Sequence, residues 1–176
     1  MPNIDDFKTK LIGGGARANL FEVKLEWPGA GSSDKNDASF LIKAASLPAS
    51  TIENIDLAYR GRMLKIAGDR TYENWTVTVI NDNNMKIRTA MEEWMNLINN
   101  NVSNTSGSFS PLDYYRDLRI TQLDRKEQKG KSYRFVNAYP IAVSAIEMAY
   151  ETNNAIEDFT VEFAYQYWTS SFGASE

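Results

Sequence analysis

The 176-residue chain contains no cysteine and no histidine. Without cysteine it has no thiol nucleophile, no thiolate metal ligand and no disulfide framework. Without histidine it lacks the commonest transition-metal ligand and the side chain that titrates near neutral pH, which excludes Ser-His-Asp chemistry and histidine-based zinc sites. Carboxylates, lysine and tyrosine could still serve a reaction, so the two absences disfavour enzymatic activity without forbidding it.

Positive charge and long apolar runs are also scarce. The 19 Lys and Arg residues against 23 Asp and Glu residues give a net charge of −4, whereas a domain that grips nucleic acid by its phosphates is usually basic. No apolar run approaches the ~20 residues that a membrane-spanning helix needs. The N-terminus lacks the basic-then-apolar layout of a signal peptide. The sequence therefore predicts neither phosphate-backbone binding as a primary role nor membrane insertion.

A packed core is predicted from what the sequence does contain. Hydrophobic residues make up 43% of the chain and aromatic residues 12%, which is enough for one domain of this length to fold without disulfides. No internal repeat or composition break divides residues 1–176. We expect residues 1–16 and the tail 169–176 to be flexible or to depend on assembly for their structure.

Alternation of apolar and polar residues predicts most of the secondary structure. Strands are expected over 19–27, 40–48, 52–67 (one or two strands with a corner at 59–62), 75–80, 115–124, 132–139 and 159–168. The segment 28–38 is expected to be a turn-rich loop. Helical spacing predicts one substantial amphipathic helix over 84–100 and a short helix over 4–11.

These elements predict a mainly β fold: an antiparallel β-sandwich or partly closed barrel with one flanking α-helix and a short N-terminal helix. Trp27, Trp75 and Trp94 each fall on an apolar face, which favours a place in the core.

No constellation of residues indicates a catalytic, cofactor or metal site. The acid pairs 5–6, 92–93 and 157–158 are adjacent in sequence, and neighbouring side chains diverge both in helices and in strands. The triplet Gly68-Asp69-Arg70 has two interpretations. It could grip an anion or substrate, but an Asp-Arg pair after a glycine more often shapes a corner that leads into a core strand.

The segment IAGDRTYENWTVTVIND (66–82) resembles the tail tube protein of T4-like contractile-tailed bacteriophages. In that family an AGDRT turn leads through a tryptophan into a WTVTV strand, an ND stop and a helix. Other matching pieces keep the same order along this chain: NLF at 19–21, LPA at 47–49, FTV at 159–161 and YW at 167–168. The resemblance covers about residues 17–168, and departs from the family pattern in longer loops at 28–37 and 99–111.

The resemblance implies that Gly68, Asp69, Arg70 and Trp75 form a structural family motif and that the protein is not an enzyme and needs no cofactor. It implies hexameric rings whose inner strands join into one barrel and which stack into a hollow tube. The implied partners are further copies of the chain and the sheath, tape-measure, baseplate and tail terminator proteins. DNA would pass through the lumen without sequence-specific binding. The protein would belong to the virion tail, after being made and assembled in the host cytoplasm.

Two groups of residues are candidates for roles in such a tube. An acidic wall would repel phosphates and let DNA slide, and Glu22, Glu26 and Glu162 are the first candidates to line it. The charged segment 124–131 is a candidate for contacts between rings, through Arg125, Lys126, Glu127 and Lys129. The N-terminal segment is a second candidate for such contacts.

Two other functions remain open from the sequence. The first is the inner tube of a non-viral contractile injection system, which shares the fold but conducts protein. The second is a carbohydrate-binding β-sandwich module, since four Trp and nine Tyr could build a sugar platform if several of them lay on an exposed face.

Overall fold

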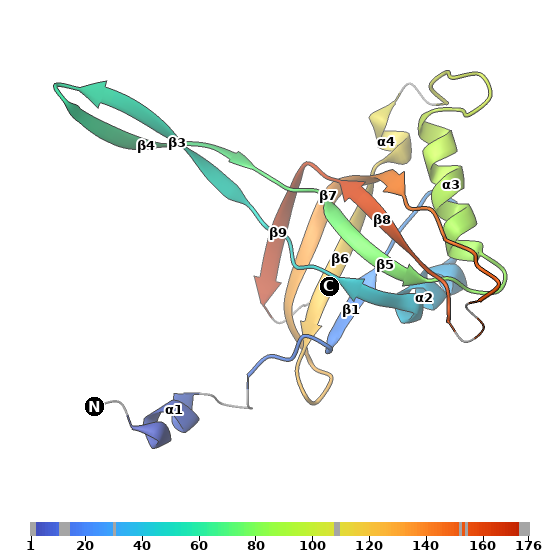
Figure 1. Cartoon of the computed structure of the whole chain (residues 1–176), viewed down its shortest axis with the longest axis horizontal. Helices are drawn as coiled ribbons and strands as arrows, with labels where there is room; N and C mark the ends of the chain where they lie inside the picture. The colour runs from blue at the N-terminus through green and yellow to red at the C-terminus, as the bar shows by residue number, and fades with distance from the viewer. Residues whose placement is uncertain are drawn as a thin grey trace.

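The computed structural model describes residues 3–10, 15–29, 31–107, 110–151, 153 and 155–172. It is mainly β and antiparallel, as the sequence predicts (Figure 1). In chain order the elements are α1 (Ile4–Lys10), β1 (Phe21–Lys24), α2 (Ser32–Leu41), β2 (Ile42–Ala45), β3 (Thr51–Tyr59), β4 (Arg62–Thr71), β5 (Trp75–Ile80), α3 (Lys86–Ile98), α4 (Pro111–Tyr114), β6 (Arg116–Leu123), β7 (Lys129–Val143), β8 (Asp158–Ala164) and β9 (Tyr167–Phe172).

Strand β7 belongs to both layers of a sandwich. Its first part pairs with β6 and with β9, and β6 pairs in turn with β1; we call this layer sheet A. Its last part pairs with β8, which continues through β5 to β2; we call this layer sheet B. A long strand shared in this way joins the two sheets along one side, so the fold is a sandwich that is partly closed towards a barrel.

The core lies between the two sheets. Alternation along β5 buries Trp75, Val77 and Val79 while Thr76 on the same strand is exposed, which confirms the predicted face. The Trp75 ring stacks on Phe135 of sheet A at 4.2 Å between centroids. Stacked aromatic pairs of this kind add to the burial of apolar area, so they hold the layers together.

Helix α3 covers the open side of the sandwich, where the predicted amphipathic helix was expected. Ile87, Met91 and Trp94 are its buried residues. The Trp94 indole donates a hydrogen bond of 2.8 Å to the Tyr114 carbonyl, which satisfies its polar atom in the core. The helix begins where the side chain of Asp82 accepts the Lys86 amide at 2.9 Å. Within the described residues no helix is long and apolar enough to cross a membrane.

Within the sandwich, the structure corrects the predicted helices and strands at two main places. Residues 32–41, which were expected to be mostly loop, form helix α2, and the strand expected from 40 begins only at Ile42. The helix packs against β1 and buries Ala38, so tertiary contact supplies the stability that its Ser- and Asp-rich sequence does not.

The second correction concerns the end of the chain. The strand expected over 159–168 is divided, because β8 ends at Ala164 and β9 begins at Tyr167 in the other sheet. Residues 169–172, expected to be loose, therefore belong to a paired strand. Residues 173–176 of the tail, and 1–2 and 11–14 of the N-terminal segment, lie outside the described residues.

Candidate assembly surfaces

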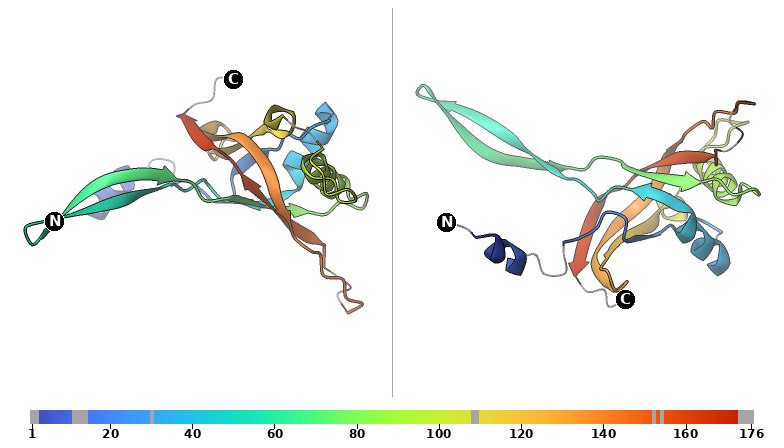
Figure 2. Two further views of the ribbon diagram at one scale, coloured as in Figure 1. Left: turned by 90° about the horizontal axis from the view of Figure 1, so that it is seen from above. Right: turned by 60° about the horizontal axis from the view of Figure 1, so that its bottom comes forward.

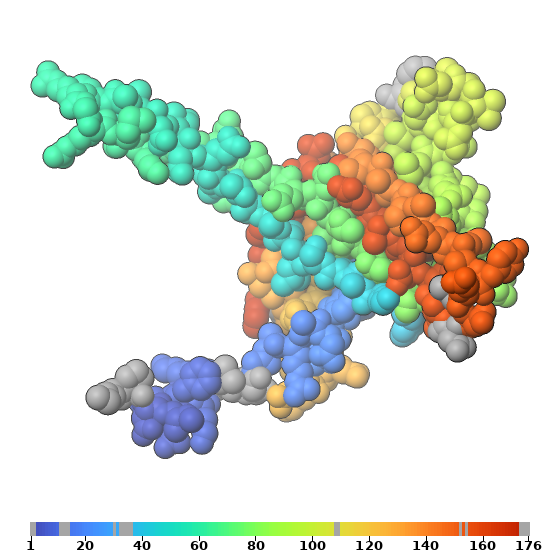
Figure 3. Space-filling view, viewed as in Figure 1, coloured from blue at the N-terminus to red at the C-terminus, as the bar shows by residue number. Residues whose placement is uncertain are grey.

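Among the strands, β3 and β4 of the hairpin are the most exposed. The hairpin stands away from the sandwich as a two-stranded ribbon, and the separation is visible in three views (Figures 1 and 2). In space-filling view it remains a narrow arm with solvent around it (Figure 3). Every residue of β3 is exposed, and in β4 only Gly68 is partly covered. A two-stranded ribbon without a packed face is at best marginally stable in water, and none of the described residues packs on this arm.

One face of the hairpin is apolar. The cross-strand pairs Ile55–Ile66 and Leu57–Leu64 lie on the same face, because the register places them opposite each other at alternate positions. The exposed fractions of Ile55, Leu57, Leu64 and Ile66 lie between 45% and 56%. The other face carries the pair Asp56–Lys65. The ribbon therefore has the amphipathic pattern of a strand pair with a covered face, but nothing in the described chain covers it.

The turn of the hairpin is built for this shape. Tyr59 pairs with Arg62, which leaves Arg60 and Gly61 as a two-residue loop. Both have positive φ, at 46° and 82°, as a type I′ turn requires and as glycine tolerates best. The corner predicted at 59–62 is confirmed.

The Gly68-Asp69-Arg70 triplet lies inside strand β4 and is not the corner that the sequence suggested. Ile52 pairs with Arg70 and Asn54 with Ala67, so Glu53 alone faces both Gly68 and Asp69. Two residues opposite one define a β-bulge, which bends and twists the ribbon. A Cβ on Gly68 would lie 2.9 Å from the Glu53 carbonyl oxygen, so only glycine fits there.

Two tryptophans hold the base of the hairpin to the body. The Trp75 indole donates a hydrogen bond of 2.7 Å to the Ser46 carbonyl, and the Trp168 indole donates one of 3.3 Å to Ala49. Both acceptors lie between β2 and β3. Since β2 pairs with β5 and β3 with β4, the hairpin continues two neighbouring strands of sheet B beyond the sandwich.

The candidate lumen acids do not share a face. Glu22 and Glu26 belong to β1 and its continuation, and Glu22 lies on the outer face of sheet A, opposite Thr121. It approaches Lys24 at 4.0 Å and Lys129 at 3.8 Å. Glu162 lies on the outer face of sheet B, opposite Thr76, and accepts a hydrogen bond of 2.8 Å from Asn74. The two sets therefore lie on opposite sides of the sandwich.

The two outer faces also differ in charge. On sheet A, Lys24, Arg119 and Arg134 stand side by side across three strands. The Arg134 Nε–H donates a hydrogen bond of 2.9 Å to the Asp117 carboxylate. On sheet B, the face presents Thr76, Thr78 and Thr160 around Glu162. Asp158 lies on the same face of β8 as Glu162, and its carboxylate pairs with the Lys43 ammonium. Both outer faces therefore carry acids and bases, and the face of sheet B carries fewer of them.

The residues proposed for contacts between rings lie in the β6–β7 turn and at the first position of β7. Arg125, Lys126, Glu127 and Lys129 are all exposed. The Asp124 carboxylate accepts the amides of Lys126 at 2.7 Å and Gln128 at 2.8 Å, so the turn has a defined shape. Its role in a contact stays a prediction.

Sequence reasoning missed the apolar face of the hairpin as a functional surface. The residues of 52–67 were expected to be strands, and they are, but nothing in the pattern states whether a face is covered. The length of the strands could have indicated that the hairpin extends beyond the body, because strands of nine and ten residues exceed the usual five or six.

This chain is similar in sequence to known tail tube proteins. A family model described as "Phage tail tube protein" matches residues 16–171. "Tail tube protein gp19" of Enterobacteria phage T4 is 30% identical over 154 residues, which cover 87% of this chain and 90% of that protein. "Tail tube protein" of Serratia phage KSP90 is 27% identical over 169 residues, 94% of this chain and 95% of that one.

A solved structure shows the same fold. A chain of the sheath–tube complex of the extracellular contractile injection system PVC, in its extended state, superimposes with a TM-score of 0.67 at 13% identity, covering 94% of this chain and 97% of that one. The resemblance seen in the motif at 66–82 is confirmed by the family match over most of the chain. The chain belongs to the phage tail tube protein family.

Proposed function

We propose that this protein builds the tube of a contractile phage tail, as a structural, non-catalytic component of the virion. Copies form hexameric rings, and the rings stack into a hollow tube inside a sheath. The observation that carries the proposal is the hairpin β3–β4, whose apolar face is uncovered and which continues sheet B beyond the body. A neighbouring copy that covers this face would bury the exposed apolar area and stabilise the ribbon.

The same observation supports a proposal for which of the two outer faces lines the lumen. The hairpin extends β2 and β5, so sheet B is the layer that can continue from one copy to the next. We therefore place Glu162 and its threonine surroundings on the lumen wall, with Glu22 and Glu26 on the opposite side of the sandwich. Glu162 and Asp158 would give this wall two carboxylates against one lysine, Lys43, which is itself paired with Asp158. Such a wall would offer DNA phosphates little attraction.

Structures of similar proteins suggest the other components that this tube would contact. The neighbour in the PVC structure belongs to a sheath–tube complex, and further neighbours are parts of an anti-feeding prophage baseplate and a tube-terminating cap. We propose that this tube likewise contacts a sheath and is bounded by a baseplate and a terminator. We also propose that it forms in the host cytoplasm around a tape-measure protein and conducts DNA.

Negative-stain microscopy of the purified protein, alone and with baseplate proteins, tests the proposal. Hollow rings or tubes are expected. A chain that stays monomeric at high concentration with baseplate present, and that binds glycans, would support the carbohydrate-binding alternative. The core positions of Trp27, Trp75 and Trp94, all at most 8% exposed, already remove three of the aromatics that a sugar platform would need.

The lumen assignment has its own test. In assembled tubes, Glu162→Cys should react with a small thiol reagent and resist one too large to enter an end-capped tube. Glu26→Cys is the matched control on sheet A and should react with both. The opposite pattern would place sheet A on the lumen.

A further inference from the structure

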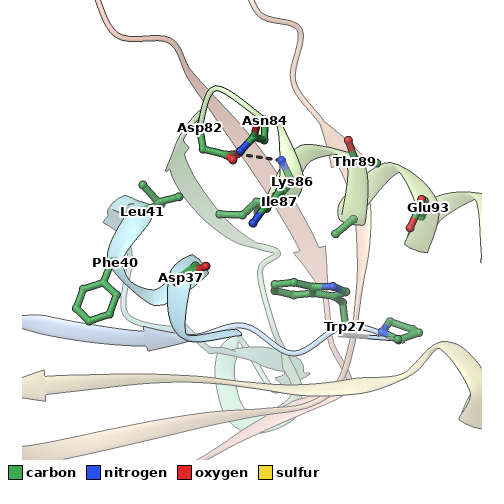
Figure 4. A pocket seen from close by; sticks show the side chains of 13 residues that line it. Trp27, Asp37, Phe40, Leu41, Asp82, Asn84, Lys86, Ile87, Thr89 and Glu93 are labelled. Carbon is green, nitrogen blue, oxygen red and sulfur yellow. Dashed lines mark hydrogen bonds between the residues drawn. The ribbon is translucent and has the colours of Figure 1, made fainter. Parts of the chain in front are cut away.

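A groove of about 670 Å³ lies between helices α2 and α3. Figure 4 shows Phe40 and Leu41 on the α2 side, Ile87 and Thr89 on the α3 side, and Trp27 between the two helices. Its volume is within the ~300–1,000 Å³ range of sites that enclose a bulky side chain or a small ligand. Phe40 is 86% exposed at its rim. The groove thus offers apolar contact that the described part of the chain leaves unused.

The groove is acidic as well as apolar. Asp37, Asp82 and Glu93 line it, against one base, Lys86. Asp82 is engaged with the Lys86 amide at the start of α3, while Asp37 and Glu93 are exposed. A fitting ligand would therefore combine a large apolar group with positive charge beside it.

The second half of helix α1 has this chemistry, whereas its first turn carries two acids. Ile4 and Phe7 are three residues apart, so they lie on one side of the helix, and they are 66% and 64% exposed. Lys8 follows Ile4 by one turn and lies 3.6 Å from the Asp5 carboxylate, in an exposed ion pair that a new partner can replace at small cost. Lys10 ends the helix. None of the seven residues of α1 is buried, and the helix stands apart from the sandwich in Figures 1 and 2.

The attachment of α1 favours the groove of another copy over its own. The Gln122 side chain donates hydrogen bonds of 2.7 Å to the carbonyls of both Arg17 and Leu20, which fixes the chain where β1 begins. From there the chain runs through β1 to Trp27, about 20 Å away if extended. Residues 11–16 span about 20 Å at most, so Phe7 could reach its own groove only with this linker almost fully extended along the body.

We propose that α1 of one copy binds in the α2–α3 groove of a neighbouring copy, with Phe7 against Trp27 and Phe40 and with Lys8 and Lys10 facing Asp37 and Glu93. The inference rests on the proposed tube, since assembly brings copies together. It assigns the receiving site for the N-terminal segment and makes α1 a clamp between subunits.

Cysteine cross-linking tests the contact with no background, because the chain contains no cysteine. Tubes of the double variant Ile4→Cys/Thr89→Cys, oxidised and run on a denaturing gel, should give a ladder of covalent multimers. Ile4→Cys/Asn101→Cys is the matched control, with its second cysteine in an exposed loop away from the groove, and should stay monomeric on the gel.

The outcomes separate this inference from the proposed function. Normal tubes without a ladder would overturn the groove assignment and leave the tube function intact. A fast-migrating cross-linked monomer would place α1 in its own groove and overturn the contact between copies. Failure of the wild-type protein to form rings or tubes, even with baseplate, would remove both.

A second measurement tests the contribution of α1 to assembly with substitutions other than cysteine. Phe7→Ser should raise the protein concentration needed for half-assembly about tenfold, the effect expected from losing one buried aromatic contact. Thr9→Ser, on the opposite side of α1, should leave that concentration unchanged. Equal behaviour of the two variants would contradict the proposed contact.

Discussion

Strand β5 and the hairpin β3–β4 adjoin in sequence, yet they treat their apolar residues in opposite ways. In β5, Trp75, Val77 and Val79 are at most 1% exposed. In the hairpin, Leu57 and Leu64 form an equally regular apolar face and are 53% and 56% exposed. An alternating sequence therefore predicts that one face of a strand is buried, but it does not show whether the same chain or another molecule buries it. For β5 the partner is the same chain, and for the hairpin we propose a second copy.

The largest expected effect is on the body. Trp75→Ala should lower the free energy of unfolding by about 3–5 kcal/mol, because it leaves a cavity between the two sheets. It also removes the hydrogen bond to Ser46. Denaturant unfolding followed by circular dichroism measures this. Thr76→Ala, exposed on the same strand, should change the value by no more than about 0.5 kcal/mol.

The hairpin should show the reverse behaviour. Leu57→Ser/Leu64→Ser should leave the unfolding free energy of the monomer within about 0.5 kcal/mol and raise the concentration for assembly at least ~100-fold, since two leucines lose their burial against a neighbour. Sedimentation of tubes measures the second quantity. Asp56→Ser, on the opposite face, is the control. A double variant that assembled like the wild type would refute the role of the apolar face.

The bulge gives a smaller effect confined to the hairpin. Gly68→Ala forces a Cβ against the Glu53 carbonyl and should straighten or loosen the ribbon, at a cost of about 1–3 kcal/mol. Assembly should weaken about tenfold or more while the melting temperature of the body stays unchanged. Ala67→Ser, at the neighbouring exposed position, should behave as wild type. A drop in melting temperature as large as that of Trp75→Ala would show that the hairpin supports the body.

The smallest effect concerns Tyr165, at the end of β8. Among the described residues its hydroxyl is buried without a hydrogen-bond partner, so Tyr165→Phe should be neutral or stabilise the body by about 1 kcal/mol. Burial, with smaller contributions from Tyr72 and Glu73, raises the pKa of Tyr165 above its ordinary value of 10.0.

The raised pKa of Tyr165 gives a pH dependence with a definite sign. The folded state favours the neutral phenol, so this contribution to stability is complete below pH 10 and is lost as the pH rises through the raised pKa. Urea unfolding at about pH 8 and about pH 11 should show a smaller alkaline loss for Tyr165→Phe than for wild type. Equal losses in the two proteins would assign the alkaline sensitivity to other groups.

The strands of the body could be predicted from the sequence because their pattern and their partner lie in one chain. The alternation in WTVTVI fixes which side of β5 is buried, and the spacing of Ile87, Met91 and Trp94 fixes the covered side of α3. The motif at 66–82 identified the family, since a specific run of residues carries information that composition does not.

Other features depend on contacts that local sequence does not encode. Helix α2 is stabilised by packing on β1 through Ala38, and its polar sequence suggests a loop. The division between β8 and β9 occurs at Tyr165 and Gln166, where the strand pattern continues unbroken but the chain changes sheets. The Gly68 triplet looked like a corner because a glycine beside charged residues is common in turns, whereas here the glycine serves a bulge.

Hydrogen exchange of the hairpin amides, measured in the free protein and in assembled tubes, tests the central claim most directly. We expect the amides of β3 and β4 to exchange rapidly in the free chain while those of β5 and β8 stay protected, because only the latter belong to a packed layer. In tubes the hairpin amides should become as protected as those of β5. Hairpin amides that exchange equally fast in free protein and in tubes would contradict the claim that a neighbouring copy covers this arm.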